Sequence, residues 1–315
     1  MFENVIKKIK KAKRVGIFTH INPDGDAMGS AFSLKAVLED MGKTADVFYS
    51  GAVEPRLLEL VVGAQESAKI TDGCDLLIAL DCAAADRLGV WSDEFLNHKN
   101  TAAIDHHVTH IEFAGDTVVG DISSTCELMY TLYIEMGIKI PFSAATNLYI
   151  GMATDTGNFK FSSVTGDTHR IIAELIDADV DFAGISKKLF DTVSKEYLDL
   201  KMRAINNMRY CLDGKVAILK LEKADFDESG ISETAASSIV TLPVSVEGVE
   251  VGVYIRHRMS EGYKVSLRSV SCVDVSEIAS VFGGGGHVRA AAYSIDAEDI
   301  SENTESLIRE IEKQL

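Results

Sequence analysis

Four short clusters of aspartate and histidine carry side chains that could bind divalent metal ions. The first is His20-Ile21-Asn22-Pro23-Asp24-Gly25-Asp26, which places one imidazole and two carboxylates within seven residues. The second is Asp81, at the end of the apolar run 76–80. The third is Asp105-His106-His107, and the fourth is Thr154-Asp155-Thr156-Gly157. Carboxylate and imidazole ligands without a thiolate suit Mn²⁺, Mg²⁺ or related ions.

Pooled, the clusters offer enough ligands for two ions that share one carboxylate. The candidate metal ligands are His20, Asp24, Asp26, Asp81, His106 and Asp155. Two ions about 3.5–4 Å apart can hold a nucleophilic hydroxide and stabilise the oxygens of an in-line phosphoryl displacement. Neighbouring side chains of an extended chain point in opposite directions, so His106 and His107 should have different tasks, one at the metal and one toward the substrate. No serine or cysteine with a paired base stands out, so metal-activated water is the simplest nucleophile.

Each cluster taken alone also has an ordinary structural explanation. Asp24-Gly25 is typical of a solvated turn or helix cap, and Asp81 of a strand end that meets solvent. Asp155 is typical of a turn at the end of a helix, and a lone histidine is often structural. The occurrence of all four clusters together favours the metal site.

A glycine-rich segment in the last third of the chain is a candidate anion site. It runs Phe282-Gly283-Gly284-Gly285-Gly286-His287, and glycines allow backbone N–H groups to approach an anion closely. Guanidinium groups that could bind phosphate lie nearby in the sequence. The candidate substrate contacts are Arg258, Arg268, Gly284, Gly285, Gly286 and His287. The alternative is a tight turn between a helix and a strand.

The order of the expected elements indicates an α/β fold in which the clusters converge. Strands are expected over 15–20, 44–50, 75–81 and 101–105, and helices over 27–41, 125–136 (capped by Ser124), 144–152, 167–176 and 182–190. A basic, amphipathic helix is expected over the first 14 residues. Continuous apolar strands that alternate with helices predict a mainly parallel sheet covered on both faces. Ligands gather at the carboxyl ends of such strands, where three of the clusters lie.

The chain of 315 residues is long enough for two domains. We expect a first domain over 1–192, a helical linker over 193–213 and a smaller α+β domain over 214–315. In the second domain, strands are expected over 215–221, 249–259, 263–269 and 290–295, with a hairpin turn at Gly262-Tyr263. Helices are expected over 194–211, 234–240, 275–282 and 300–315.

Composition narrows the class of partner. The net charge of −17 disfavours long nucleic acid, which is bound through many phosphate contacts. A short RNA or a small nucleotide can still bind through a few fixed cations. The five cysteines are odd in number and form no Cys-x-x-Cys pair, which fits a reducing cytoplasm. No apolar run approaches the roughly 20 residues of a spanning helix, so no membrane partner is expected.

These motifs resemble those of a known family. His20-x-Asn-Pro-Asp24-x-Asp26, Asp81, Asp105-His106-His107 and Asp155 are similar to the four motifs of DHH phosphoesterases. The glycine-rich segment with His287, after Arg268, resembles the DHHA1 substrate domain. The resemblance covers nearly the whole chain in the right order. The two-domain layout is most similar to the nanoRNase and pAp-phosphatase group, which hydrolyses short oligoribonucleotides and 3′-phosphoadenosine 5′-phosphate.

The resemblance implies a role for each motif. It implies His20, Asp24 and Asp81 on one ion, and Asp26, Asp81, His106 and Asp155 on the other, with Asp81 bridging. The usual metal implied is Mn²⁺, with Mg²⁺ as an option. It implies catalytic roles for Asp81, Asp105 and His107, with His107 facing the scissile phosphate. The glycine-rich segment, His287 and Arg268 would hold the terminal phosphate of the substrate.

One departure and two alternative functions stay open. Relatives commonly continue with Ala-Ala-Gly where this chain has Val288-Arg289-Ala290-Ala291-Ala292, which would narrow the pocket, while Arg289 could add a phosphate contact. A soluble cyclic-dinucleotide phosphodiesterase is the main alternative enzyme, and a nucleotide sensor without turnover is the non-enzymatic one. A homodimer is a possible assembly.

Overall fold

Five parallel strands form the centre of the first half of the chain, in the order β2-β1-β3-β4-β5. They are β1 (Arg14–Phe18), β2 (Thr44–Phe48), β3 (Leu76–Leu80), β4 (Thr101–Asp105) and β5 (Asp116–Val119). Strands β3 and β4 are buried along their whole length. The expected parallel sheet is therefore confirmed, and β5 adds an edge strand that the sequence pattern did not indicate.

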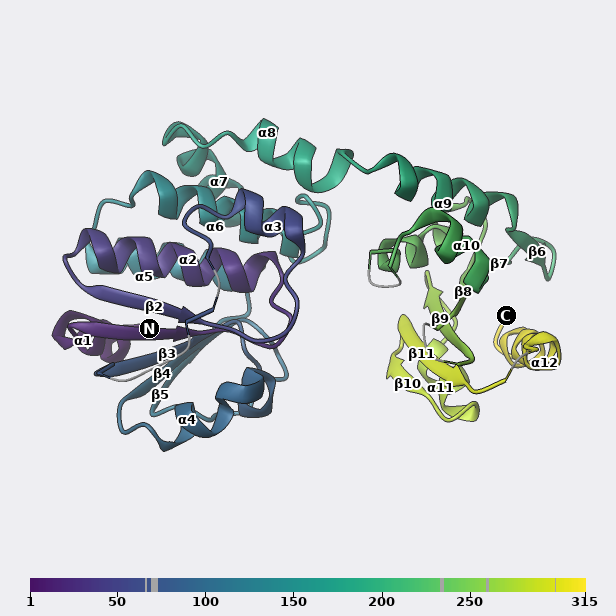
Figure 1. Cartoon of the computed structure of the whole chain (residues 1–315), viewed down its shortest axis with the longest axis horizontal. Helices are drawn as coiled ribbons and strands as arrows, with labels where there is room; N and C mark the ends of the chain where they lie inside the picture. The colour runs from purple at the N-terminus through teal and green to yellow at the C-terminus, as the bar shows by residue number, and fades with distance from the viewer. Residues whose placement is uncertain (66, 69–72, 233–234, 259–260, 298) are drawn as a thin grey trace. The chain divides into compact units, whose positions relative to one another are not determined.

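This computed structural model describes residues 1–65, 67–68, 73–232, 235–258, 261–297 and 299–315. The chain divides into two compact units, Met1–Thr192 and Val193–Leu315 (Figure 1). Within the described residues, no helix has both the length and the apolar character needed to cross a bilayer.

Helices cover both faces of the first sheet (Figure 1). Helices α2 (Gly25–Asp40), α5 (Thr125–Met136) and α6 (Phe142–Asp155) pack over the face that carries Ile17 and Ile78. The 3₁₀ segment η1 (Ala85–Trp91) and helix α4 (Ser92–Asn97) pack over the face that carries Phe18 and Leu77. The remaining elements of this unit are α1 (Glu3–Lys11), α3 (Pro55–Leu60), α7 (Gly166–Asp177), α8 (Phe182–Ser186) and a π-helical turn, η2 (Lys187–Asp191).

Helices α2 and α6 approach each other closely at Gly29. A Cβ atom added there would lie 2.5 Å from the carbonyl oxygen of Asn147, so only glycine allows this contact. Helix α6 is also longer than the range 144–152 that we expected. It continues to Asp155, which places this aspartate in the last helical turn rather than in a loop.

A six-stranded sheet in the order β10-β11-β9-β8-β7-β6 forms the second unit. Its strands are β6 (Arg209–Cys211), β7 (Val216–Leu221), β8 (Val251–His257), β9 (Tyr263–Ser269), β10 (Gly285–His287) and β11 (Ala290–Ile295). Helices α11 (Val275–Val281) and α12 (Ser301–Glu312) pack on one face. Helices α9 (Lys195–Asn206) and α10 (Lys223–Ser229) pack on the other, with the 3₁₀ segment η3 (Ser237–Thr241). A short 3₁₀ turn, η4 (Pro243–Ser245), follows η3.

Two expectations for this unit were wrong in part. The helix predicted over 194–211 ends at Asn206, and Arg209–Cys211 instead pairs with β7 as an edge strand. The helix predicted over 234–240 is instead a 3₁₀ segment from Ser237 to Thr241. Residue 234, the first of the predicted range, lies outside the described residues.

The second half of the glycine-rich segment is a strand and not a loop. Gly285–His287 forms β10 and pairs antiparallel with β11. The N–H groups of Gly283 and Gly284 donate to the carbonyls of Ser280 and Ala279, where they close helix α11. These two N–H groups are therefore already used and do not point at an anion.

Candidate metal centre and active site

Polar side chains from β1, β3 and the start of α2 form a first ligand group at the carboxyl edge of the sheet. The Nε2 atom of His20 lies 3.7 Å from Oδ2 of Asp81 and 3.8 Å from Oδ2 of Asp24. Asp24 caps α2, because its Oδ1 accepts from the N–H groups of Asp26 and Ala27. That cap leaves the other oxygen of Asp24 directed to His20.

A second ligand group lies on the other side of Asp81. The Nε2 atom of His106 lies 3.3 Å from Oδ2 of Asp155 and 3.9 Å from Oδ2 of Asp26. It also lies 3.6 Å from Oδ1 of Asp81. Asp81 therefore presents Oδ2 to the first group and Oδ1 to the second.

Asp81 adopts a strained backbone conformation to reach this position. Its φ is 55°, in the left-handed region that residues other than glycine adopt uncommonly, although asparagine and aspartate do so more often than the rest. Asp81 is only 2% exposed, so its side chain lies inside the protein and not in solvent. Strain of this kind is retained where the surrounding structure enforces it, most often at functional sites. The explanation of Asp81 as a solvated strand end does not fit this burial.

Helix α5 holds two of the carboxylates through its first turn. The backbone N–H groups of Thr125 and Cys126 donate to Asp26 over 2.6 and 2.9 Å. The hydroxyl of Thr125 donates to Oδ1 of Asp81 over 3.0 Å. A helix N-terminus favours anions, so this arrangement stabilises negative charge at Asp26. Sequence reasoning identified the helix and its Ser124 cap but missed the role of Thr125, which no motif marks.

The start of α2, which carries Asp24 and Asp26, lies close to the end of α6 because position 25 is glycine. A Cβ atom on Gly25 would lie 2.3 Å from Oγ1 of Thr154, the residue before Asp155. A larger side chain would push the start of α2 away from the end of α6. Gly25 therefore permits Asp26 and Asp155 to approach the same imidazole.

The carboxylates are crowded and short of positive charge. Burial raises the pKa of Asp81 to about 7, and the charge of Asp24 adds to the rise. Burial raises the pKa of Asp26 well above its usual value, with further contributions from Asp81 and Asp155. Burial is also the main reason why the pKa of Asp155 is raised. Cations placed between these oxygens would relieve both the repulsion and the desolvation.

The donor set fits two hard divalent ions. Three groups each hold ligand atoms within 4.8 Å of one another: His20, Asp24 and Asp81; Asp26, His106 and Asp155; and Asp81, His106 and His107. Oxygen and imidazole ligands match Mn²⁺ or Mg²⁺. The thiol of Cys126 is buried and donates to the carbonyl oxygen of Asp26. Burial raises the pKa of that thiol well above its usual value, so it offers no thiolate ligand.

Asp105 lies between two histidines beside this centre. Its Oδ1 accepts from Nδ1 of His107 over 2.7 Å, and its Oδ2 accepts from Nδ1 of His110 over 2.6 Å. The hydrogen bond to Asp105 raises the pKa of His107 to about 9, although burial opposes the shift. Burial acts to raise the pKa of Asp105, but the two imidazoles outweigh it and the pKa is lowered. Sequence reasoning missed His110, although its spacing from His107 was visible in the sequence.

The predicted substrate contacts in the second unit differ in availability. Arg268 is half-buried on β9, and its guanidinium donates to the carbonyl of Leu267. Arg258 is engaged by Asp296 and by the carbonyl of Glu261. Gly284 to His287 are mostly exposed, with His287 at the end of β10. Arg289 donates to the carbonyl of Val273, so its guanidinium is already used in a contact within the protein.

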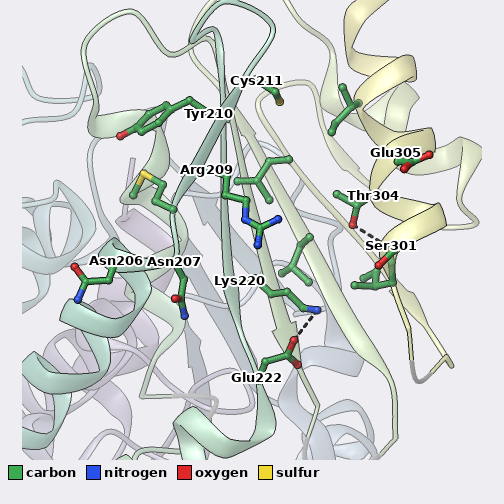
Figure 2. A pocket seen from close by; sticks show the side chains of 15 residues that line it. Asn206, Asn207, Arg209, Tyr210, Cys211, Lys220, Glu222, Ser301, Thr304 and Glu305 are labelled. Atoms are coloured by element: carbon green, nitrogen blue, oxygen red, sulfur yellow. Dashed lines mark hydrogen bonds and ion pairs between the residues drawn. The ribbon is translucent and has the colours of Figure 1, made fainter.

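A cavity of about 760 Å³ in the second unit lies apart from Arg268. Figure 2 shows Arg209 from β6, Lys220 from β7, Glu222 just after β7 and side chains of α12 around it. Ile255 on β8 also lines the cavity. Arg268 on β9 pairs with Gly252, which lies three residues before Ile255 on β8. Odd spacing on a strand reverses the side chain, so Arg268 and the cavity are on opposite faces of the sheet.

Comparison with known proteins agrees with this arrangement of motifs. Residues 14–152 match the model of the DHH family N-terminal domain, and residues 213–315 match that of the DHHA1 domain. A relative from Thermus thermophilus, named bifunctional oligoribonuclease and PAP phosphatase NrnA, is 32% identical over 95% of this chain and 89% of its own. The chain belongs to the DHH family.

Two further relatives show that the similarity extends through both units. A probable bifunctional oligoribonuclease and PAP phosphatase NrnA from Streptococcus mutans is 29% identical over 98% of this chain and 99% of its own. The crystal structure of an exopolyphosphatase-related protein from Bacteroides fragilis superposes with a TM-score of 0.89 at 27% identity. That superposition covers 99% of this chain and 95% of the other. The α/β first unit and the α+β second unit are therefore the family layout.

Proposed function

We propose that this protein is a metal-dependent phosphoesterase that hydrolyses short oligoribonucleotides and 3′-phosphoadenosine 5′-phosphate. The observation that carries the proposal is the position of Asp81, whose two oxygens face two separate ligand groups. A single carboxylate between two groups is the arrangement that a pair of bridged divalent ions requires. When bound, such ions activate a water molecule and neutralise charge on the phosphate oxygens.

The residues of the chain divide the work as follows. His20, Asp24 and Asp81 would hold one divalent ion, and Asp26, Asp81, His106 and Asp155 would hold a second, with Mn²⁺ or Mg²⁺ as the proposed metal. Asp105 and Asp81 complete the catalytic set with His107. The bond from Nδ1 of His107 to Asp105 leaves Nε2 of that ring for the scissile phosphate. A protonated His107 at neutral pH can donate to a phosphate oxygen or to the leaving group.

The choice of substrate rests on charge and on the relatives. A net charge of −17 disfavours binding of a long strand, which depends on many phosphate contacts. Arg268, supported by Gly285–His287, is proposed to bind a terminal phosphate and so to favour short substrates; Gly284, whose N–H closes α11, is not proposed as a contact. Two relatives carry names that specify oligoribonuclease and PAP phosphatase activities. Cytoplasmic location and a homodimer stay predictions.

One panel assay tests the proposal. The purified protein would be incubated with Mn²⁺ and, separately, pAp, pApA, a 5-residue RNA, a 25-residue RNA, cyclic di-AMP and pyrophosphate. We expect rapid hydrolysis of pAp and the short RNAs, loss of activity in chelator and recovery with Mn²⁺. Turnover limited to cyclic di-AMP and pApA would support the alternative phosphodiesterase, and full activity in chelator would contradict the metal site.

A matched pair of variants separates the metal site from general damage. Asp81→Asn removes one negative charge between the two ligand groups and is expected to abolish turnover. Asp93→Asn makes the same chemical change at an exposed position on α4 and should leave turnover unchanged. Equal activity of the two variants would refute the role of Asp81.

A further inference from the structure

The side chain of His110 is buried next to the proposed active site, and among the described residues its ring has one hydrogen-bond partner. Its side chain is only 3% exposed, and its ring stacks on Phe113 with ring centroids 5.6 Å apart. Its Nδ1 atom lies 2.6 Å from Oδ2 of Asp105. Its Nε2 atom is buried and, within the described residues, has no hydrogen-bond partner.

Burying an imidazole for packing alone would be unfavourable at this position. A buried polar group costs free energy unless it is hydrogen-bonded, and an apolar side chain would fill the space beside Phe113 without that cost. The bond to Asp105 is the interaction that offsets the burial of His110. The histidine is therefore explained by what it does to Asp105.

Asp105 accepts hydrogen bonds at both of its carboxylate oxygens. Its Oδ1 accepts from Nδ1 of His107 and also from the backbone N–H groups of His106 and His107. Its Oδ2 accepts from His110. An ionised carboxylate only accepts hydrogen bonds, so both imidazoles carry hydrogen on Nδ1. Removal of the His110 imidazole would leave Oδ2 of Asp105 buried and without the hydrogen bond that it now accepts.

The segment that carries His110 is itself anchored to the sheet. The N–H of His110 donates to the carbonyl of His107 over 3.1 Å, and the N–H of Ile111 donates to the carbonyl of Ala83 over 2.8 Å. Ala83 follows Asp81 on the loop after β3. The position of His110 is thus tied to the same strand ends that carry the proposed metal ligands.

We propose that His110 is a positioning residue for His107 that acts through Asp105. Its Nδ1–H fixes the rotation of the Asp105 carboxylate, so that Oδ1 holds Nδ1 of His107 and directs Nε2 of that ring to the substrate. The inference rests on the proposed function for its effect on rate, but the hydrogen-bond chain itself exists without turnover. His110 touches neither substrate nor metal ligand in this scheme.

Three substitutions at this position distinguish positioning from packing. His110→Asn keeps an amide N–H at the distance of Nδ1 from the backbone, because both groups are bonded to Cγ. His110→Gln moves its amide one bond further out, and His110→Leu keeps the bulk without a donor. Outer partners of active-site groups typically contribute 10- to 100-fold, so we expect Leu and Gln to lower kcat on pAp by roughly that factor. KM and Mn²⁺ occupancy should change little, Leu should lower Tm because Oδ2 of Asp105 loses its donor, and Asn should keep most of the rate and of the Tm.

Proton NMR of ¹⁵N-histidine-labelled protein, with Mg²⁺ in place of Mn²⁺, tests the positioning without turnover. In the wild type we expect slowly exchanging Nδ1–H signals for both His107 and His110. In His110→Leu the His107 signal should broaden through exchange with water, and in His110→Asn it should persist. A sharp, unshifted His107 signal in the Leu variant would overturn the proposal, as would equal kcat for Leu and Asn. Absence of hydrolysis by the wild type would instead refute the proposed function, while the NMR result would still decide the positioning.

Discussion

The hydroxyl of Thr125 provides the sharpest test of how the proposed bridging carboxylate is held. Thr125→Val replaces the hydroxyl by a methyl group of nearly the same size and removes the donor 3.0 Å from Oδ1 of Asp81. The backbone N–H of residue 125 still donates to Asp26, so the substitution affects Asp81 alone. We expect weaker binding of Mn²⁺ and slower turnover.

The expected magnitude follows from the burial of both partners. Thr125 is fully buried and Asp81 is 2% exposed, so water does not replace the lost donor. A hydrogen bond to a charged group contributes about 1.5–3 kcal/mol. Since each 1.4 kcal/mol is roughly a factor of ten, Mn²⁺ affinity should fall by about 10- to 100-fold. This range agrees with typical effects of outer partners of metal ligands.

Isothermal titration calorimetry with Mn²⁺ measures the affinity, and pAp hydrolysis at saturating Mn²⁺ measures the rate. Thr125→Ser is the matched control, because it keeps the hydroxyl and loses only the methyl group, at about 1 kcal/mol of stability. We expect Ser to bind Mn²⁺ like the wild type. The reasoning would be refuted if Val bound Mn²⁺ as tightly as the wild type, or if Ser lost as much affinity as Val.

Three further predictions address other parts of the chain. His106→Ala should lower metal occupancy measured by elemental analysis, whereas His107→Ala should keep the metal and lose rate; equal metal loss would contradict this division. Arg268→Ala should raise KM for pAp by an amount equivalent to about 1.5–3 kcal/mol, without effect on bis(p-nitrophenyl) phosphate. Burial acts to raise the pKa of Glu250, but bonds from Ser271–Val273 lower it to about 2. The stabilisation from Glu250 is therefore present above its ordinary pKa of 4.5 and is lost as pH falls toward 2. Glu250→Gln should lower Tm at pH 7 and have no effect near pH 2, and a constant difference would count against this linkage.

Local patterns predicted most of the elements, and their failures have local causes. Ser124 and the apolar spacing after it predicted Thr125–Met136 correctly, because a side-chain cap and the helix are encoded within a few residues. Arg209–Cys211 continued a helix-like pattern, and only pairing with β7 makes it a strand. The glycines of β10 have little strand preference of their own, so their conformation depends on β11.

The sequence by itself determined the kinds of ligand, their order along the chain and the edge of the sheet at which most of them lie. Apolar runs that end in His20, Asp81 or Asp105 are local features, and the carboxyl ends of parallel strands meet at one edge. The tertiary structure decided which oxygen of Asp81 faces which imidazole, and it brought Thr125 and His110 to the carboxylates. Thr125 and Asp26 are 99 residues apart, and Thr125 and Asp81 are 44 apart. Hydrogen bonds over such separations depend on how helix α5 packs against the sheet, and no periodicity within a single segment records that packing.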